Sequence, residues 1–433
     1  MAEFFYGLIA HYLSLYIRPE DHMVEVNPIS ANLKPFFKNY ETLHPEEVTA
    51  TSAPKPEPAD GGGNYYVLNG CLHYEPDIQG LFERLRPLVS DAGRVVIVYY
   101  SQLWKPLVTL ATMLGLRSKQ PEENWISHED VTNLLYLADF EVVRRESKIL
   151  CPVYIPLLST LANRYLAPLP VFQWLTMVNV LVARPLPKDG ASPRPSVSVV
   201  VAARNESGNI QNILDRCPKM GPDDELIFVE GNSTDDTWEK IGELVKTYTG
   251  PLKILTCQQD GKGKGDAVRK GFSIATKDIL MILDADLTVP PEDLPKFYDA
   301  IASGKGEFIN GSRLVYPMEK EAMRFFNILG NKFFSIAFSF VLAQKFKDTL
   351  CGTKVLSREH YRRLAANRSF FGEFDPFGDF DLIFGAARLG LKIVEIPIRY
   401  RERTYGETNI HRWRHGSILL AMLVFAARKI KFI

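Results

Sequence analysis

The sequence lacks several features that would place it at once in a broad functional class. Basic and acidic side chains are equal in number, 51 of each in 433 residues, so the formal net charge is zero and nothing indicates a nucleic-acid partner. The five cysteines are scattered, without a Cys-x-x-Cys pair or the spacing of a zinc site. We therefore predict a protein of a reducing compartment, the cytoplasm, that binds no nucleic acid.

The sequence also has little that would carry it across a membrane. The first ten residues have no basic segment before their apolar part, so we expect no signal peptide. No apolar run reaches the roughly 18 residues that a spanning helix needs. The composition, 46% hydrophobic and 24% charged, is that of an ordinary globular protein. We expect a protein that is soluble or attached to a membrane surface.

Two segments rich in proline or glycine divide the chain. Residues 46–63 end in three glycines, and residues 185–195 contain four prolines, which predicts loops in both places. A periodic apolar pattern restarts after the second segment, at Val197. We therefore predict a first domain over residues 1–185, a linker over 186–195, a second domain over 196–410 and a terminal segment over 411–433.

The first predicted domain alternates between strands and helices, which is typical of an α/β fold. A capping sequence at Ser127 opens one of the helices. The expected helices cover residues 5–17 and 78–88, and the expected strands cover residues 22–27, 64–69, 93–100, 140–143 and 177–183.

This order resembles class I S-adenosylmethionine-dependent methyltransferases, over residues 1–184. The resemblance rests on residues 68–74, on residues 85–88 leading into 93–98, and on Asp130 with residues 138–143. It implies a Rossmann-like sheet. The family has a glycine-rich loop after its first strand, whereas residues 24–31 keep Glu25 and contain no glycine. We therefore expect a scaffold or interaction platform that does not bind S-adenosylmethionine, with an active methyltransferase as the alternative.

The second predicted domain is organised around residues 279–286, in which an apolar run leads directly into Asp284 and Asp286. Such a run indicates a buried strand of a parallel sheet, and ligands bind at the carboxyl edge of these sheets. Side chains two apart on a strand point the same way. Two carboxylates at one point suit Mg²⁺ or Mn²⁺. The alternative is a plain loop in which Asp286 caps the helix that begins near Pro290.

Three more expected strands end in polar segments. We predict the strands over residues 197–203, 225–229 and 252–257, and the polar segments over 204–206, 230–237 and 261–265. Because parallel strands share one carboxyl edge, we expect these segments to converge with Asp284 and Asp286. Ser233 or Thr234 is expected to cap the helix that follows the second strand.

These segments together resemble family 2 glycosyltransferases of the GT-A fold, over residues 195–400. The matching motifs are residues 203–206, 229–237, 263–265 and 284–286. The resemblance implies a nucleotide-sugar site, with uracil or guanine as the base, and a metal held by Asp284 and Asp286. The residues that it implies for the nucleotide sugar are Ala202, Arg204, Glu206, Glu230, Lys264 and Asp284.

Later motifs, at residues 309–313, 347–354, 377–381 and 399–408, resemble the branch that glycosylates polyprenyl phosphates. That resemblance implies acceptor-phosphate binding by Arg313 and Arg403, with Arg324 as a third. An ionised phosphate needs no strong base, whereas arginine forks hold its charge well. A sugar hydroxyl acceptor would instead need an acid of the Asp379 and Asp381 pair as its base. The catalytic set is therefore Asp286, Arg313, Asp379 and Asp381.

The terminal segment, residues 411–433, combines basic residues, Trp413 and a short apolar stretch, which is typical of a membrane-interface helix. The Phe-rich residues 325–343 have the same potential, although both segments are also compatible with core helices. We predict a metal-dependent, inverting hexosyltransferase that moves a sugar to a polyprenyl phosphate at the inner face of a membrane. The alternatives are a soluble glycan or metabolite acceptor, and a nonenzymatic nucleotide-binding or assembly module.

Overall fold

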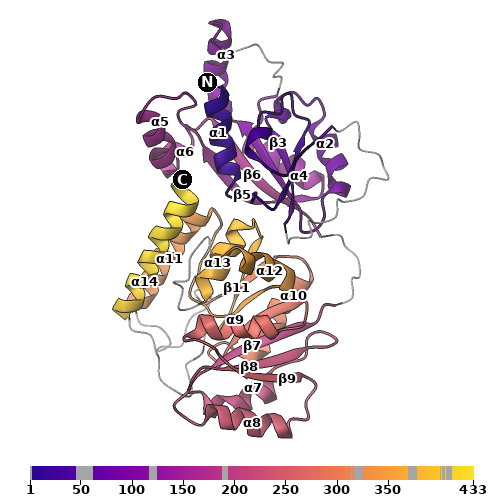
Figure 1. Cartoon of the computed structure of the whole chain (residues 1–433), viewed down its shortest axis with the longest axis vertical. Coiled ribbons are helices and arrows are strands. Elements are labelled where there is room, and N and C mark those ends of the chain that lie inside the picture. Colours follow the sequence, from indigo (N-terminus) through magenta and orange to yellow (C-terminus); the bar gives the residue numbers. More distant parts are fainter. Residues whose placement is uncertain are drawn as a thin grey trace. The chain divides into compact units, whose positions relative to one another are not determined.

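A computed structural model describes residues 2–44, 62–116, 124–187, 194–313, 315, 325–368, 378–399, 401, 405 and 412–433. The chain divides into two compact units. The first comprises Met1–Lys188 together with Ala427–Ile433, and the second comprises Asp189–Ala426. Both are mixed α/β units, each built on one sheet (Figure 1). The domain boundaries drawn from the sequence remain a prediction.

The first unit has six strands in the order β2-β1-β3-β4-β6-β5. The strands β2, β1, β3 and β4 are parallel, whereas β6 is antiparallel to both of its neighbours. Strand β2 was not predicted, because its four residues alternate little in polarity. The strands are β1 (His22–Val26), β2 (Tyr40–Leu43), β3 (Asn64–Asn69), β4 (Arg94–Tyr100), β5 (Phe140–Lys148) and β6 (Val178–Pro185).

This sheet is covered on both faces. Side chains alternate between the two faces of a strand, so a continuous apolar strand places apolar side chains on both of them. In β4, Val95, Ile97 and Tyr99 pack into one apolar cluster, while Val96 and Val98 pack into the other. The methyltransferase resemblance of this unit stays a prediction. Its helices are α1 (Ala2–Leu13), α2 (Ile78–Leu85), α3 (Lys105–Met113), α4 (His128–Leu137), α5 (Leu158–Thr160) and α6 (Pro170–Gln173), with a π-helical turn over Leu161–Leu166.

The second unit has seven strands in the order β13-β11-β12-β10-β7-β8-β9. The predicted parallel arrangement of four strands is confirmed for β10, β7, β8 and β9. Strand β12 is antiparallel to β10 and β11 and was not predicted, since it is only four residues long. The strands are β7 (Val197–Ala203), β8 (Glu225–Glu230), β9 (Lys253–Gln258), β10 (Ile279–Asp284), β11 (Phe308–Ser312), β12 (Lys354–Ser357) and β13 (Ile393–Pro397).

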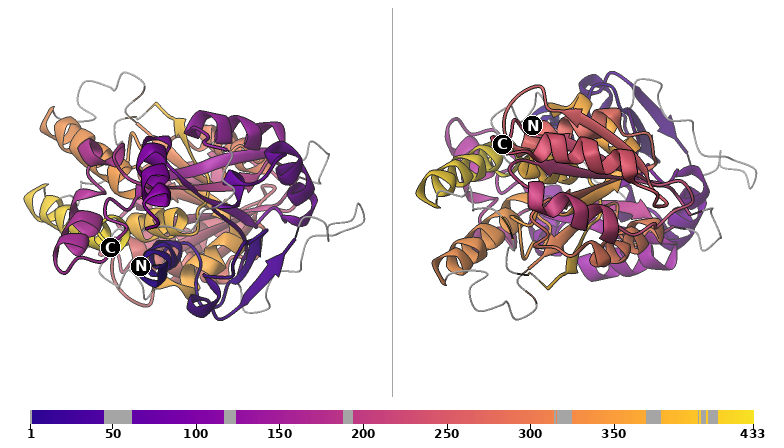
Figure 2. Two further views of the ribbon diagram at one scale, coloured as in Figure 1. Left: turned by 90° about the horizontal axis from the view of Figure 1, so that it is seen from above. Right: turned by 90° about the horizontal axis from the view of Figure 1, so that it is seen from below.

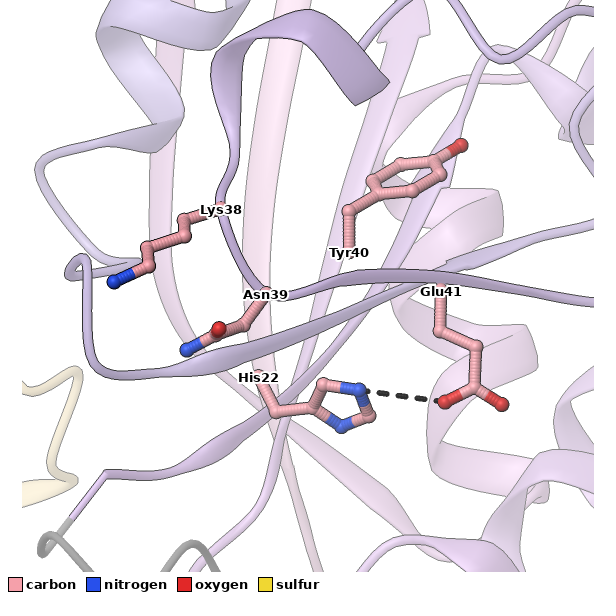
Figure 3. Close-up of a pocket in the computed structure, with 5 residues that line it drawn as sticks. All are labelled: His22, Lys38, Asn39, Tyr40 and Glu41. Carbon is pink, nitrogen blue, oxygen red and sulfur yellow. Dashed lines mark ion pairs between the residues drawn. The ribbon is translucent and has the colours of Figure 1, made fainter.

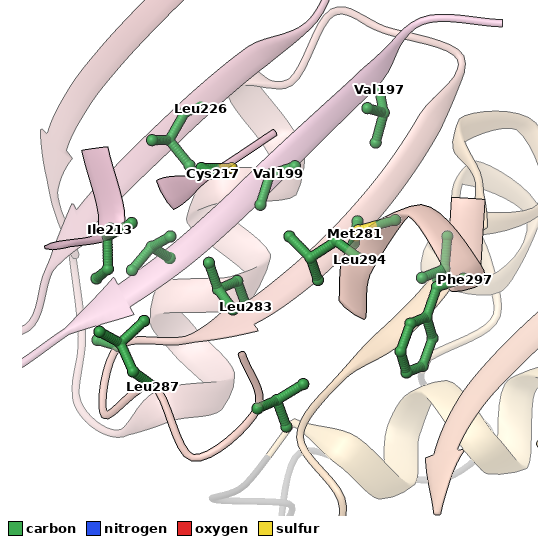
Figure 4. Packing of buried hydrophobic residues seen from close by; sticks show 14 of the residues in the cluster. Val197, Val199, Ile213, Cys217, Leu226, Met281, Leu283, Leu287, Leu294 and Phe297 are labelled. Atoms are coloured by element: carbon green, nitrogen blue, oxygen red, sulfur yellow. The ribbon is translucent and has the colours of Figure 1, made fainter. Parts of the chain in front are cut away.

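Helices lie on both sides of this sheet (Figures 1 and 2). Val197, Val199 and Val201 of β7 pack with Ile213 of α7 and Phe297 of α10 in one buried cluster (Figure 4). On the opposite face, α9 approaches so closely that a Cβ at Gly271 would overlap with Val200. The helices are α7 (Ile210–Arg216), α8 (Thr237–Thr247), α9 (Lys264–Ile274), α10 (Leu294–Ala302), α11 (Phe325–Leu342), α12 (Arg358–Ala366), α13 (Asp379–Arg388) and α14 (Arg412–Ala426).

Two local predictions are wrong. Neither the Ser233 side chain nor the Thr234 side chain caps α8, because both form hydrogen bonds with Asn205 instead. At the start of α8, the Thr237 amide donates to the Asp235 carboxylate at 3.1 Å. Lys431 is not part of an exposed basic flank. Its ammonium lies 3.1 Å from a carboxylate oxygen of Glu146 in the interior of the first unit, where both side chains are nearly inaccessible.

None of the helices in the described part of the chain is both long and apolar enough to cross a membrane.

Candidate functional site

The carboxyl edge of the second sheet brings together the strand ends that the sequence singled out. In the ladder register, Asp284 is paired with Ala202, and Glu230 is paired with Ala203. Chain connections leave β7 toward β8 on one side, while β10 lies on the other. This is the switch point at which open α/β sheets form a crevice. Neighbouring strands are about 4.8 Å apart, so Asp284 and Glu230 lie on the same stretch of edge.

Lys264 and Asp284 form the central ion pair of this edge, with Nζ 2.5 Å from Oδ1. Burial opposes the charge of Lys264, but Asp284, Asp379 and Asp286 together outweigh it and raise the pKa of the ammonium. Burial also opposes the charge of Asp284, but the nearby Lys264, followed by Lys354 and Arg313, lowers the pKa of this carboxyl. Both groups are therefore charged at neutral pH.

Gly352 lies directly against this ion pair. A Cβ at position 352 would overlap with both Asp284 carboxylate oxygens and with Lys264 Nζ. A side chain at position 352 would therefore displace the Lys264 and Asp284 side chains from their present positions.

The glycine-rich segment before α9 places Lys264. Gly263 has a φ of 86° and a ψ of 163°, a conformation that is essentially limited to glycine. Gly265 packs backbone against backbone on Gly378, which itself has a φ of 72° and precedes α13. This contact brings the first turn of α13, with Asp379 and Asp381, toward Lys264.

Asp379 and Asp381 are both buried. Asp379 Oδ1 lies 3.4 Å from the ammonium of Lys354, a completely buried lysine whose Nζ also donates to the Cys351 carbonyl. Asp381 Oδ2 lies 3.5 Å from Nε of Arg368. The two acids thus contact different cations, and Asp379 is the one beside the Lys264 and Asp284 pair.

Glu230 and Glu206 are buried at the ends of β8 and β7. Glu230 accepts hydrogen bonds from the Ser233 amide at 2.5 Å and from Gln258 at 3.1 Å. Glu206 accepts one from Asn209 at 2.7 Å. Arg204 is exposed, and its Cβ lies close to Gly231, so a larger residue at position 231 would crowd it.

Two asparagines hold these strand ends together. Asn205 and Asn232 both have a φ of 56°, a backbone conformation that asparagine accepts more readily than most residues. Asn205 Oδ1 accepts from the Thr234 amide at 2.8 Å, and Asn232 donates to the Gly261 carbonyl at 3.2 Å. The ends of β7 and β8 and the glycine-rich segment therefore form one connected rim.

Asp286 lies two residues beyond Asp284, and its Oδ1 accepts hydrogen bonds from the amide and the hydroxyl of Thr288 at 3.1 and 2.8 Å. Leu287 lies between Asp286 and Thr288 in the chain and has a φ of 55°. A positive φ is uncommon for a residue other than glycine and is often found at functional sites. The described residues contain no group of three or more His, Cys, Asp or Glu side chains that could hold a metal. A pair of carboxylates fits only a cation that takes most of its ligands from water and substrate phosphates, such as Mg²⁺ or Mn²⁺.

Arg313 forms a two-pronged ion pair with Asp348, through Nε at 2.7 Å and Nη2 at 2.9 Å. Burial raises the pKa of the Asp348 carboxyl, but Arg313 and Asn331 outweigh it and lower the pKa to about 2. The structure thus fixes the guanidinium of Arg313 at the end of β11 through a buried partner that the sequence did not indicate.

Ile398, Arg401 and Tyr405 contact the same edge. The Ile398 amide donates to the carbonyl of Ser312, the last residue of β11, and the Arg401 amide donates to the carbonyl of Thr288 after β10, both at 3.0 Å. Tyr405 packs on Gly208, and its hydroxyl lies 3.1 Å from Ser207 Oγ, after β7. Arg403 and Arg324 lie outside the described residues.

Three residues of this edge had no role in the sequence prediction: Lys354, Asp348 and Gly352. All belong to residues 347–354, one of the motifs on which the resemblance to the polyprenyl-phosphate branch rests. Their partners are distant in the chain, so only the fold could reveal them.

The first unit has a separate, open pocket of about 440 Å³, lined by His22, Lys38, Asn39, Tyr40 and Glu41 (Figure 3). His22 Nε2 lies 3.3 Å from a carboxylate oxygen of Glu41. The pocket is at the first residues of β1 and β2, which is the amino edge of this sheet. At the carboxyl end of β1, the buried Glu25 accepts hydrogen bonds from Tyr40 at 2.5 Å and from Asn69 at 3.3 Å.

Comparison with known proteins concerns the second unit. Residues 198–365 match the family described as Glycosyl transferase family 2. The second unit contains a family 2 glycosyltransferase domain. The prediction of an enzyme of this kind is therefore confirmed, whereas the methyltransferase resemblance of the first unit is not tested by this match.

Two named relatives of the glycosyltransferase domain come from archaea. The dolichol-phosphate mannosyltransferase of Pyrococcus furiosus is 31% identical over 220 residues, which are 49% of this chain and 59% of that protein. The dolichyl-phosphate hexose transferase of Haloferax volcanii is 28% identical over 228 residues, 52% of this chain and 90% of that protein. The chain thus spans little more than half the length of the Pyrococcus relative.

Among solved structures, glucosyl-3-phosphoglycerate synthase from Mycobacterium tuberculosis, in complex with Mn²⁺, UDP and glucosyl-3-phosphoglycerate, aligns with 55% of this chain and 80% of that chain. The sequence identity is 18% and the TM-score is 0.38. A score of this size does not establish a common fold.

Proposed function

We propose that the protein transfers a sugar from a nucleoside-diphosphate sugar to a polyprenyl phosphate, with inversion at the sugar. The observation that carries the proposal is the Lys264 and Asp284 ion pair beneath Gly352, at the switch point of the sheet. The names of the Pyrococcus and Haloferax relatives support the class of acceptor. The GT-A fold of this domain is part of the same proposal.

The residues at the edge suit a donor that leaves as a nucleoside diphosphate. Lys264 would donate to the diphosphate and stabilise the negative charge that grows on it as the sugar bond breaks. Glu230 and Glu206, already held by neighbouring amides, would accept hydrogen bonds from the base and ribose. Asp284 and Asp286 would hold Mg²⁺ or Mn²⁺, which supplies further positive charge to the leaving diphosphate.

The acceptor would be a phosphate already ionised at neutral pH. Arg313 is positioned by Asp348, so its guanidinium loses little freedom when it binds an anion. Arg403 and Arg324 remain predicted acceptor ligands. Asp379, which pairs with Lys354, would orient that lysine rather than abstract a proton, because a phosphate acceptor has no proton to remove.

The reaction would take place at a membrane surface, because a polyprenyl chain is insoluble in water, and the inner face is proposed as its side. Helices α11 and α14 pack together and support the proposal, since Leu329, Phe333 and Ile336 of α11 and Leu420 and Val424 of α14 are exposed. The first unit is proposed to be a methyltransferase-like scaffold that does not use S-adenosylmethionine.

A donor screen tests this function. The full chain is incubated with Mn²⁺ and a panel of nucleotide sugars, and released nucleoside diphosphate is measured with and without a polyprenyl phosphate. We expect release from one donor that depends on the lipid phosphate. Release that needs a soluble glycan instead would move the assignment to the alternative acceptor, and no release from any donor would contradict the proposal.

A further inference from the structure

Two stretches of the first unit are almost free of charge. Residues 101–116 contain one charged side chain, Lys105, and residues 149–176 contain one, Arg164. Neither stretch has an acidic residue, in a chain of which 24% is charged. The elements they form, α3 and α5 to α6, do not contribute to the strands of the sheet.

Helix α3 exposes most of its apolar side chains. Val108 is its only described residue that is buried. Leu107, Leu110 and Met113 are each more than half exposed, and the helix extends away from the sheet of its unit (Figure 1). A helix that is apolar on its outer side is stable in water only when something else covers that side.

The segment from α5 through the π-helical turn buries polar side chains and exposes apolar ones, the reverse of an ordinary surface helix. Its buried side chains are polar: Ser159 donates to the Ile155 carbonyl, and the Asn163 amide bonds to the backbone of Leu150 and Cys151. Leu158 and Leu161 face outward instead. This arrangement puts polar groups inside and leucines outside, which suits an apolar environment around the segment.

Leu157, just before α5, is the most exposed leucine of this segment. Its side chain is 88% exposed, and its backbone has a φ of 64°. The Leu158 amide bonds to the Pro156 carbonyl at 2.7 Å across it, which is a strained γ-turn. A leucine is unfavourable here both for its exposure and for its backbone, so folding alone does not explain its presence.

The two stretches meet on the unit. Trp104 Nε1, at the start of α3, donates to the carbonyl of Leu175 at 2.8 Å. We define the lipid-facing patch as the exposed residues Leu107, Leu110, Met113, Leu157, Leu161 and Trp174.

Basic side chains lie next to this patch. Lys105 and Arg164 are exposed within the two stretches, and the Arg164 guanidinium donates to the Phe432 carbonyl at 3.2 Å. This bond holds Phe432 beside the second stretch, and Arg428 and Lys429 in the preceding turn are exposed. Leucines and tryptophan beside basic residues, in stretches that contain no acid, are the composition of a surface that lies on anionic lipid.

We infer that the first unit binds the surface of an anionic bilayer through the lipid-facing patch. This goes beyond the proposed function, since it gives the methyltransferase-like unit a role as a membrane anchor that does not depend on sugar transfer. Apolar side chains of the patch enter the boundary between headgroups and acyl chains, while the basic residues contact lipid phosphates. The absence of acids in both stretches favours this occupant over a second copy of the chain, whose patch would carry the same positive charge.

Vesicle flotation of the full chain tests the inference. The vesicles are made of phosphatidylcholine, alone or mixed with phosphatidylglycerol. The test variant is the double substitution Met113→Asn and Leu157→Asn, because both positions are exposed. Asparagine also accepts the positive φ at position 157. The control is Leu137→Asn at the end of α4, an exposed leucine of the same unit outside the patch.

We expect the wild type and L137N to float with the mixed vesicles, and the double variant to bind at least about tenfold more weakly with an unchanged melting temperature. Equal flotation of all three proteins would overturn the inference, as would no flotation of the wild type. Self-association that the double variant abolishes, without vesicle binding, would show a contact between copies instead. Flotation without sugar transfer would contradict the proposed function alone.

Discussion

Replacement of Lys264 by methionine separates the role of its charge from its role in the fold. The side chain of Lys264 is 31% exposed and that of Asp284 is 22% exposed, so the ion pair is partly screened by solvent. Such a pair is worth roughly 1 kcal/mol of unfolding free energy. Methionine keeps the length and apolar packing of the side chain, so we expect K264M to remain folded.

The effect on activity should be much larger. A charge-assisted hydrogen bond to the diphosphate contributes about 1.5–3 kcal/mol, and K264M also leaves Asp284, Asp286 and Asp379 with less opposing charge. We therefore expect kcat/KM for the donor to fall about 10- to 100-fold or more. The assay is release of nucleoside diphosphate at saturating polyprenyl phosphate, with the melting temperature measured in parallel.

Lys262 offers a matched control in the same glycine-rich segment. It is exposed, and its substitution K262M removes an equal charge two residues away from Lys264. We expect K262M to keep nearly full activity. Equal losses in both variants, or full activity in K264M, would refute the reasoning, because the effect would then depend on net charge or on neither lysine.

Three other changes have defined outcomes. Gly352→Ala would displace the side chains of Lys264 and Asp284, so activity should fall at least about tenfold; the melting temperature should change little, because these side chains can move. The control is Gly242→Ala, whose Cβ meets no neighbour. Full activity of G352A would contradict the close approach of Gly352 to the ion pair. Asp348→Asn should lower the unfolding free energy at pH 7 by about 3 kcal/mol in urea titrations, because it leaves Arg313 without its partner. The lowered pKa of Asp348, about 2 against its usual 3.8, stabilises the fold above pH 3.8, so the difference between wild type and D348N should shrink as the pH falls toward 2. Burial lowers the pKa of Lys148 from 10.5 to about 8, so the unfolded chain binds more protons between these two values and stability should rise with pH across that window. Lys148→Met should abolish this rise in urea titrations at several pH values, and an unchanged pH profile would contradict it.

The strands of the second sheet could be predicted because buried parallel strands have a strong pattern. Continuous apolar runs mark β7, β8 and β10, and each leads into polar residues at its carboxyl end. The rule that these ends share one edge then predicted the convergence of Asp284, Lys264 and Glu230. Strands β2 and β12 could not be predicted in this way, because four residues give no periodic pattern.

The partners of the site residues were beyond the reach of the sequence. The pairing of Arg313 with Asp348 depends on a buried contact between β11 and the loop before β12. The contact of Gly265 with Gly378 depends on how α9 and α13 pack. In the same way, the outward-facing Leu157, Leu158 and Leu161 look like core residues in the sequence, and only their exposure in the folded unit indicates lipid.

The central claim is that the edge of the second sheet transfers sugar to a lipid phosphate, and one measurement tests it directly. The full chain is given its labelled nucleotide sugar, Mn²⁺ and a polyprenyl phosphate, and the label is counted in the organic phase for the wild type and for Asp286→Asn, which keeps the oxygen that accepts from Thr288. We predict label in the organic phase with the wild type and a loss of at least about 100-fold with D286N. Equal labelling by the two proteins, or label that never leaves the aqueous phase, would contradict the claim.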